Sequence, residues 1–150
     1  MRKSKLFVAV FVIAFVTMFS AVAMAASYYE CNATGVEKNG SRKADVKFRV
    51  NADGVILSGQ IVIPASTAKF AFPGGEYVYA DGSKLTRDQG QYEWIMEANC
   101  VDKATQNRVT VMARKFRIQN IAELQIKDRA GSTWFVFPHG WEYKQVTDDK

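Results

Sequence analysis

Apolar and polar residues alternate with a period of two through most of residues 26–150. In the segment ADVKFRV, at 44–50, the apolar residues share one parity and the charged residues share the other. This pattern predicts a β-strand with one face in the core and one face in water. VILSGQIVIP, RVTVMARKFRI, IAELQIKD and STWFVFP continue the pattern. In QYEWIMEANC, one face is expected to hold Tyr92, Trp94, Met96, Ala98 and Cys100.

Turn residues separate these segments. Asn39-Gly40 and the sequence NADG at 51–54 flank the first strand, and Pro64 closes the next. Asp81-Gly82 predicts a hairpin turn. A helical period of 3.6 residues does not extend over any full window. The sequence therefore predicts an all-β fold, a small antiparallel barrel or sandwich of about eight main strands, and we favour the barrel.

Residues 1–25 have the layout of a secretory signal peptide. Three basic residues precede an apolar run at 6–19, and small residues lead to the Ala-x-Ala sequence that ends at Ala25. Cleavage is expected between Ala25 and Ala26, which predicts a periplasmic or secreted protein without stable membrane insertion. The alternative is an uncleaved anchor, because residues 6–25 are long enough to span a bilayer.

The expected mature chain, residues 26–150, carries little net charge. Removing residues 1–25 takes away three of the 20 basic residues and none of the 15 acidic ones, so the net charge falls from +5 to +2. A globally basic nucleic-acid-binding protein is therefore not indicated. The remaining length suits a single β-domain.

The chain contains two cysteines, Cys31 and Cys100. In an exported protein, two cysteines predict one disulfide, which would leave no thiol for nucleophilic catalysis. The alternative is a pair of buried free thiols.

Four short segments recur in the same order in the two halves of the chain. The first set is Cys31, KFRV at 47–50, QI at 60–61 and FAFPGG at 70–75. The second set is Cys100, KFRI at 115–118, QI at 125–126 and FVFPHG at 135–140. Their nearly constant offset favours an internal duplication, with pseudo-repeats at about 27–86 and 92–146. Chance similarity among strand sequences is the alternative.

The duplication predicts a core position for the repeated phenylalanines. Phe70 and Phe72 are expected to point from a strand into the core, as are the phenylalanines of FVFP, before a proline that ends strand pairing. A β-bulge near Arg114 is expected to return Phe116 and Ile118 to the core face.

The end of the second copy is the candidate binding site. His139 and Trp141 have no counterpart in the first copy, and Tyr143 follows Trp141 at the same parity. Aromatic residues at a loop are typical of sites that bind a protein or a flat ligand. Arg114 and Arg117 add a basic surface if the strands that hold them pair. The alternatives are an aromatic plug at the open end of the fold and a solvated strand face.

The sequence lacks the patterns of common catalytic and metal sites. His139 is the one histidine, so no zinc-ligand spacing occurs. There is also no Gly-x-Ser-x-Gly turn and no glycine-rich phosphate loop. We therefore expect neither an enzyme nor a metal or cofactor site, and a hydrolase that uses His139 is the remaining catalytic alternative.

These observations together predict an exported, non-enzymatic binding module. Its expected partner is a protein of the cell envelope or a secreted protein, as for inhibitors and immunity proteins, and not a nucleic acid. The alternative is a periplasmic carrier that holds a small apolar ligand inside a β-barrel.

Overall fold

The computed structural model describes residues 26–141 and 143–148, which form strands and turns without a helix. These residues contain nine strands. They are β1 (Ala26–Glu37), β2 (Lys43–Asn51), β3 (Ile56–Ile63), β4 (Gly75–Gln89), β5 (Tyr92–Asp102), β6 (Arg108–Phe116), β7 (Ala122–Lys127), β8 (Ser132–Phe137) and β9 (Tyr143–Asp148). Two compact units are distinguished, Tyr28–Gln145 and a small one that includes residues 26–27 and 146–148. The signal peptide predicted for residues 1–25 lies outside the described residues.

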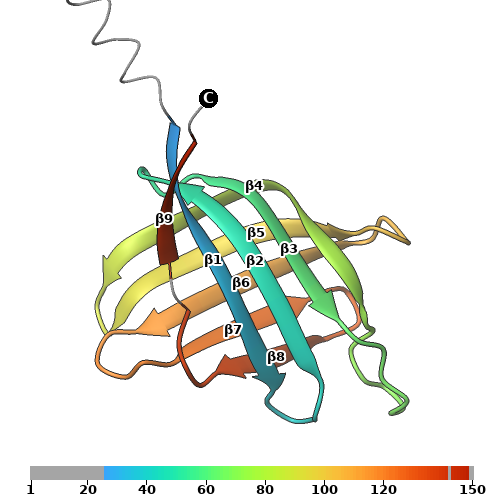
Figure 1. Ribbon diagram of the computed structural model, residues 1–150. Coiled ribbons are helices and arrows are strands. Elements are labelled where there is room, and N and C mark those ends of the chain that lie inside the picture. The colour runs from blue at the N-terminus through green and yellow to red at the C-terminus, as the bar shows by residue number, and fades with distance from the viewer. Residues whose placement is uncertain (1–25, 142, 149–150) are drawn as a thin grey trace, which may run out of the picture. The chain divides into compact units, whose positions relative to one another are not determined.

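Eight of the described strands close into an antiparallel barrel, which confirms the all-β prediction and favours the barrel over the sandwich. The order is β2-β3-β4-β5-β6-β7-β8-β1, and β1 also pairs with β2 to complete the ring. From β2 to β8, each strand pairs with the next strand in the chain (Figure 1). In the sheet order, β9 follows β1.

The barrel closes differently on the two sides of β1. On one side β1 pairs with β2 from Tyr28 to Val36. On the other, the described pairs with β8 are Val36 with Val136 and Glu37 with Phe135. Beyond them, the Phe137 ring lies so close to Gly35 that a Cβ there would be 2.8 Å from the ring. Side-chain packing therefore fills the place where strand pairing between β1 and β8 stops.

The barrel interior is filled with apolar side chains. β2 shows the predicted alternation, with every second residue from Ala44 to Val50 buried and the residues between them exposed. Trp141 lies against three other aromatic rings, at centroid distances of 6.2 Å to Phe48, 5.0 Å to Trp94 and 5.3 Å to Phe137. An eight-stranded barrel is just wide enough for side chains to fill, and these rings occupy that width.

The predicted disulfide is wrong, because Cys31 and Cys100 are buried free thiols. Cys31 lies on β1 and Cys100 on β5, and three strands separate β1 from β5 in either direction around the barrel. The two cysteines therefore belong to opposite walls. Burial raises the pKa of Cys100 to about 12. Burial also raises the pKa of Cys31.

The hairpin predicted at Asp81-Gly82 is also wrong. β4 continues through this dipeptide from Gly75 to Gln89, with irregular pairing to β5 on both sides of Asp81. Gly82 has a φ of 65°, which lets the strand bulge and continue instead of reversing. The chain reverses later, at Gly90, whose φ is also 65°.

The core position predicted for Phe70 is wrong, whereas the one for Phe72 is right. Phe70 lies in the loop between β3 and β4 and is 97% exposed, while Phe72 is 7% exposed. In the second copy, Phe135 and Phe137 are both fully buried on β8. The first Phe-x-Phe segment is not in a strand, so its two rings need not share a face.

The bulge predicted near Arg114 does not occur there. The register pairs Tyr92 with Phe116 and Trp94 with Lys115, which leaves an extra residue on β5 instead of β6. Phe116 therefore stays on the outer face, and Ile118 is 95% exposed in the following loop.

Three of the four matched pairs of segments lie on strands that are four places apart in the chain order. Cys31 and Cys100 are on β1 and β5, KFRV and KFRI begin on β2 and β6, and the two QI pairs are on β3 and β7. The fourth pair differs, because FAFP is in a loop and FVFP is at the end of β8. The orientation also differs, since Phe48 is buried and Phe116 faces outward. The internal duplication stays a hypothesis.

Candidate functional site

The predicted site residue Arg114 lies at the centre of an aromatic and cationic cluster on the outer wall of the barrel. We call this cluster the aromatic face, and its members come from β5, β6, β7, β8 and the turn after β1. They are Lys38, Tyr92, Arg114, Phe116, Glu123 and Trp134.

The Arg114 guanidinium on β6 contacts aromatic rings on β5, β6 and β8. Its central carbon is 5.0 Å from the centroid of Trp134, 5.2 Å from Tyr92 and 6.0 Å from Phe116. Tyr92 and Phe116 contact each other with centroids 5.2 Å apart. Cations at these distances over aromatic rings are attracted by the ring quadrupole. Arg114 thus joins rings from three strands into one surface.

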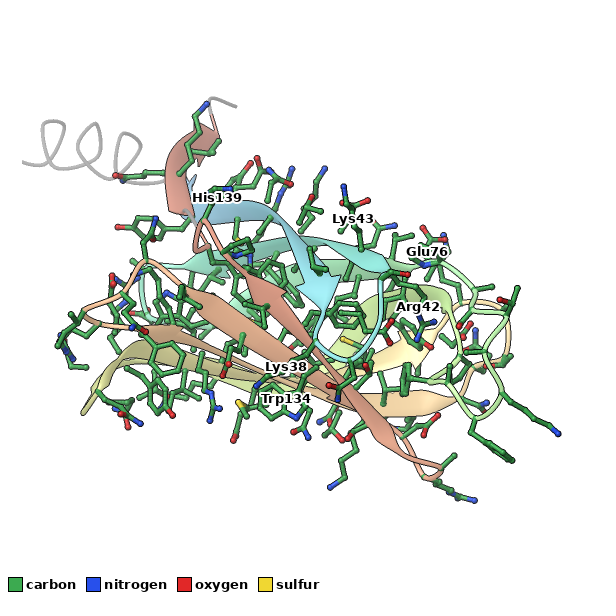
Figure 2. The ribbon with its side chains drawn as sticks, turned by 90° about the horizontal axis from the view of Figure 1, so that it is seen from below. Lys38, Arg42, Lys43, Glu76, Trp134 and His139 are labelled. Atoms are coloured by element: carbon green, nitrogen blue, oxygen red, sulfur yellow. The ribbon has the colours of Figure 1, made fainter. Side chains whose placement is uncertain are left out.

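Glu123 fixes the two cations of the aromatic face. Nε and Nη2 of Arg114 donate hydrogen bonds to Oε1 of Glu123, at 3.0 and 2.9 Å. Nζ of Lys38 lies 3.6 Å from Oε2 of the same carboxylate and 5.8 Å from the centroid of Trp134. Figure 2 shows Lys38 and Trp134 beside each other. The side chain of Lys38 is 53% exposed and that of Glu123 is 13% exposed, so the carboxylate lies beneath its partners.

Strand register explains why these side chains meet. Arg114 pairs with Glu123 across β6 and β7, and Glu123 pairs with Val136 on β8. Trp134 has the same parity as Val136 and therefore faces outward, while Phe135 faces the core. The extra residue on β5 turns Tyr92 to this outer face, so the prediction that it shares the core face of Trp94 is wrong.

The other predicted basic residue, Arg117, supports a turn next to the aromatic face. Its Nε donates to the carbonyl of Gly90 at 3.1 Å and its Nη2 to the carbonyl of Tyr92 at 3.2 Å. Its Nη1 is 3.5 Å from a carboxylate oxygen of Asp88. A hollow of about 440 Å³ lies between Arg117 and Ile118 on one side and the turn at Gly90 on the other.

The two predicted residues of the last loop, His139 and Trp141, are not brought together with Arg114. Trp141 is 3% exposed, so it plugs the barrel and is not available to a partner. His139 is exposed, its carbonyl accepts a hydrogen bond from Asn120 at 3.1 Å, and it lies away from Lys38 and Trp134 in Figure 2. The side chain of Tyr143 lies outside the described residues.

The sequence analysis missed the aromatic members of this site. Trp134 could have been found from its parity, which is opposite to that of Phe135 and Phe137. Tyr92 and Phe116 could not, because their orientation depends on the position of the bulge on β5. That bulge has no proline or glycine to mark it.

A buried ion pair lies at the end of the barrel that contains the turn between β1 and β2. Nε and Nη2 of Arg42 donate to the carboxylate of Glu37 at 3.1 and 2.8 Å, and Oγ1 of Thr133 donates to the same carboxylate at 3.1 Å. The hydrogen bonds from Arg42 hold the pKa of Glu37 below its ordinary value, against the effect of burial. Nη1 of Arg42 also donates to the carbonyl of Pro64 at 3.0 Å. This group, which we call the Arg42 clasp, uses its hydrogen bonds to join neighbouring segments.

In the described residues, no cluster of three or more His, Cys, Asp or Glu side chains is arranged to hold a metal ion. The same part of the chain contains no helix of the length and hydropathy needed to cross a membrane.

Comparison with known proteins does not place the chain in a family. No family model, no curated protein and no solved structure matches it.

Proposed function

We propose that this protein is an exported, non-enzymatic binding module that recognises a protein of the cell envelope through its aromatic face. One observation carries this proposal. Arg114 holds aromatic rings from three strands in a single, partly exposed surface. Aromatic residues and arginine are the side chains that contribute most often to protein–protein affinity.

The rigidity of the aromatic face supports its use in binding. Its rings are on strands of a closed barrel, and Glu123 fixes the orientation of Arg114. Side chains that are already ordered lose little conformational entropy when a partner binds, so more of the contact energy appears as affinity. The side chain of Arg114 is 28% exposed, so it is partly desolvated before binding.

The interior of the barrel gives less support to the carrier alternative. The space that a small apolar ligand would need holds Trp141 and the three rings in contact with it. The hollows described in the structure include one on the outer wall between β1 and β3, beside Asp45 and Gln60. This packing favours recognition by the outside of the barrel.

The proposal is tested by capturing partners from a cell-envelope extract of the source organism. The immobilised protein is expected to retain a distinct envelope protein, whose affinity is then measured with purified components. Trp134→Ala should raise the dissociation constant at least about tenfold, as expected for an aromatic residue at the centre of an interface.

Leu57→Ala is the matched control, because Leu57 is an apolar residue of β3 that is 50% exposed on the outer wall. It should leave the affinity unchanged. Thermal unfolding of each variant separates lost binding from lost folding. Absence of any retained protein, or equal affinity of wild type and a folded Trp134→Ala variant, would overturn the proposal.

A further inference from the structure

The loop between β3 and β4 presents an aromatic ring to solvent. Residues 64–74 connect the two strands and project from the barrel at the lower right of Figure 1. Phe70, near the middle of this loop, is 97% exposed. This loop is separate from the aromatic face and is not used by the function proposed above.

The base of the loop is firmly attached to the barrel. The carbonyl of Pro64 accepts a hydrogen bond from Arg42 at 3.0 Å, and the carbonyl of Pro73 accepts one from the hydroxyl of Tyr77 at 3.0 Å. The ring of Phe72 packs on Tyr77 with centroids 6.1 Å apart. These contacts attach both ends of the loop to the barrel.

The tip has a backbone conformation that disfavours its own side chain. Phe70 has a φ of 64°, in the left-handed region where glycine or asparagine is the usual residue. The centroid of its ring is 5.8 Å from Nζ of the adjacent Lys69. An aromatic ring that packs on no core residue and occupies a disfavoured conformation is unexplained by stability. Exposure together with a disfavoured backbone conformation instead fits contact with a partner.

Unpaired positive charge surrounds the same end of the barrel. The up-and-down topology brings four turns to this end, namely 38–42, 64–74, 103–107 and 128–131. Four cations in or next to these turns form no ion pair within the described part of the chain. They are Lys43, Lys69, Lys127 and Arg129. The acidic residue of the last turn, Asp128, accepts hydrogen bonds from the amides of Ala130 and Gly131, at 2.8 and 3.0 Å.

We propose that this end of the barrel docks on an anionic phospholipid membrane, with Phe70 inserted among the headgroups. The unpaired cations would then face lipid phosphates. A projecting apolar ring with basic neighbours is the chemistry that peripheral proteins use at anionic membrane surfaces. A lipid surface accepts one projecting ring from any direction, whereas a protein partner needs a matching pocket and a wide contact area. The convex tip therefore favours the membrane over a protein.

Vesicle binding by the wild-type protein and by single variants tests the proposal. Wild type should bind vesicles of mixed phosphatidylglycerol and phosphatidylcholine, and Phe70→Ala should bind about tenfold more weakly, the loss expected when one phenylalanine leaves an apolar environment. Lys69→Gln should weaken binding about fivefold on these vesicles, which is the factor for one cation near an anionic surface, and should have no effect on pure phosphatidylcholine. Ile118→Ala is the matched control, because Ile118 is 95% exposed at the opposite end of the barrel.

A fluorescent probe at the tip reports insertion even if another segment also binds lipid. Cys31 and Cys100 are fully buried, so a polarity-sensitive thiol dye attaches selectively to Phe70→Cys or to Ile118→Cys. Emission from position 70 should shift to shorter wavelength on anionic vesicles, while emission from position 118 should not.

Three results would overturn the membrane proposal: no shift at position 70, an equal shift at both positions, or undiminished vesicle binding by Phe70→Ala. If Phe70→Ala no longer binds a protein partner and the dye at position 70 shows no shift on vesicles, the loop would be assigned to protein recognition instead. These variants leave the aromatic face intact. A failure of the membrane proposal is therefore distinguishable from a failure of the proposed function.

Discussion

Individual residues in this protein have environments that their neighbours in the sequence do not reveal. Cys31 and Cys100 are both fully buried, whereas Phe70 is almost fully exposed in a segment that repeats a core motif. A thiol in an apolar environment is costly to ionise, because its thiolate loses hydration. Burial therefore determines the chemistry of the cysteines more than the compartment in which the protein is expected to work.

The free thiols lead to a prediction about reactivity. At about pH 8, iodoacetamide should modify neither Cys31 nor Cys100 in the folded protein, because only the thiolate reacts. Both should react after unfolding in urea without a reductant, as intact mass would show. A chain that remains unmodified in urea would contradict the free-thiol structure.

The same thiols predict a loss of stability in alkali. The folded protein keeps them protonated to a higher pH than the unfolded chain, in which the ordinary pKa is about 8.5. Their contribution to the free energy of unfolding is complete below about pH 8.5 and is lost as the pH rises toward the raised pKa of the folded thiols. Cys100→Ala should reduce the fall of the free energy of unfolding with rising pH. Urea unfolding measured at pH values below and above about 8.5 checks this.

At the scale of strands, two glycines make room for aromatic rings of the core. Gly59 on β3 pairs directly with Phe48 on β2, and a Cβ at Gly59 would overlap the Phe48 ring. A Cβ at Gly35 on β1 would likewise lie too close to the ring of Phe137, at 2.8 Å. A glycine in a strand thus allows a large ring to lie flat against the barrel wall.

Gly59→Ala is therefore expected to destabilise the protein. Phe48 is 1% exposed, so its ring has little free space into which to move. Overpacking of this kind costs about 1–3 kcal/mol in the free energy of unfolding, measured by urea denaturation. Ser58→Ala, at the neighbouring exposed position, should change the free energy by less than about 0.5 kcal/mol. Equal effects of the two variants would show that the ring is not confined.

In the molecule as a whole, long-range side-chain contacts lie at both ends of the closed barrel. The Arg42 clasp joins Glu37 on β1, Thr133 on β8 and the chain after β3. Trp141 fills the interior toward the opposite end, where it stacks on Phe137 with ring planes 7° apart. One end is thus secured by an ion pair and the other by aromatic packing.

The clasp predicts a loss of stability in acid. The pKa of Glu37 is lowered in the folded protein, so its contribution is present above the unfolded value of about 4.3 and is lost as the pH falls through the folded pKa. Glu37→Gln should lower the melting temperature near neutral pH and should flatten its fall below about pH 4.3. Glu97→Gln is the control, since Glu97 is exposed and forms no ion pair with a described residue. If the melting temperature of Glu37→Gln falls in acid as steeply as that of the wild type, this role of Glu37 would be contradicted.

The alternation of residues allowed the strands and their core faces to be predicted, because successive side chains of a strand point to opposite faces whatever the fold. It identified the buried face of β2 and the core positions of Phe135 and Phe137, and it favoured a barrel. Arg114, chosen as part of a basic cluster, lies among aromatic rings in the structure, and its role in binding stays a prediction. Trp141 was chosen for its place in a loop, and the structure instead buries it.

The sequence by itself determined the class of fold and the inner and outer faces of most strands, since both follow from local backbone geometry. Only the tertiary structure decided which walls face each other and where a strand gains an extra residue. The closure of the barrel puts Cys31 and Cys100 on opposite walls, and the extra residue on β5 turns Tyr92 toward Arg114. These features result from pairing between strands remote in the chain, and strand register is a property of the partners together.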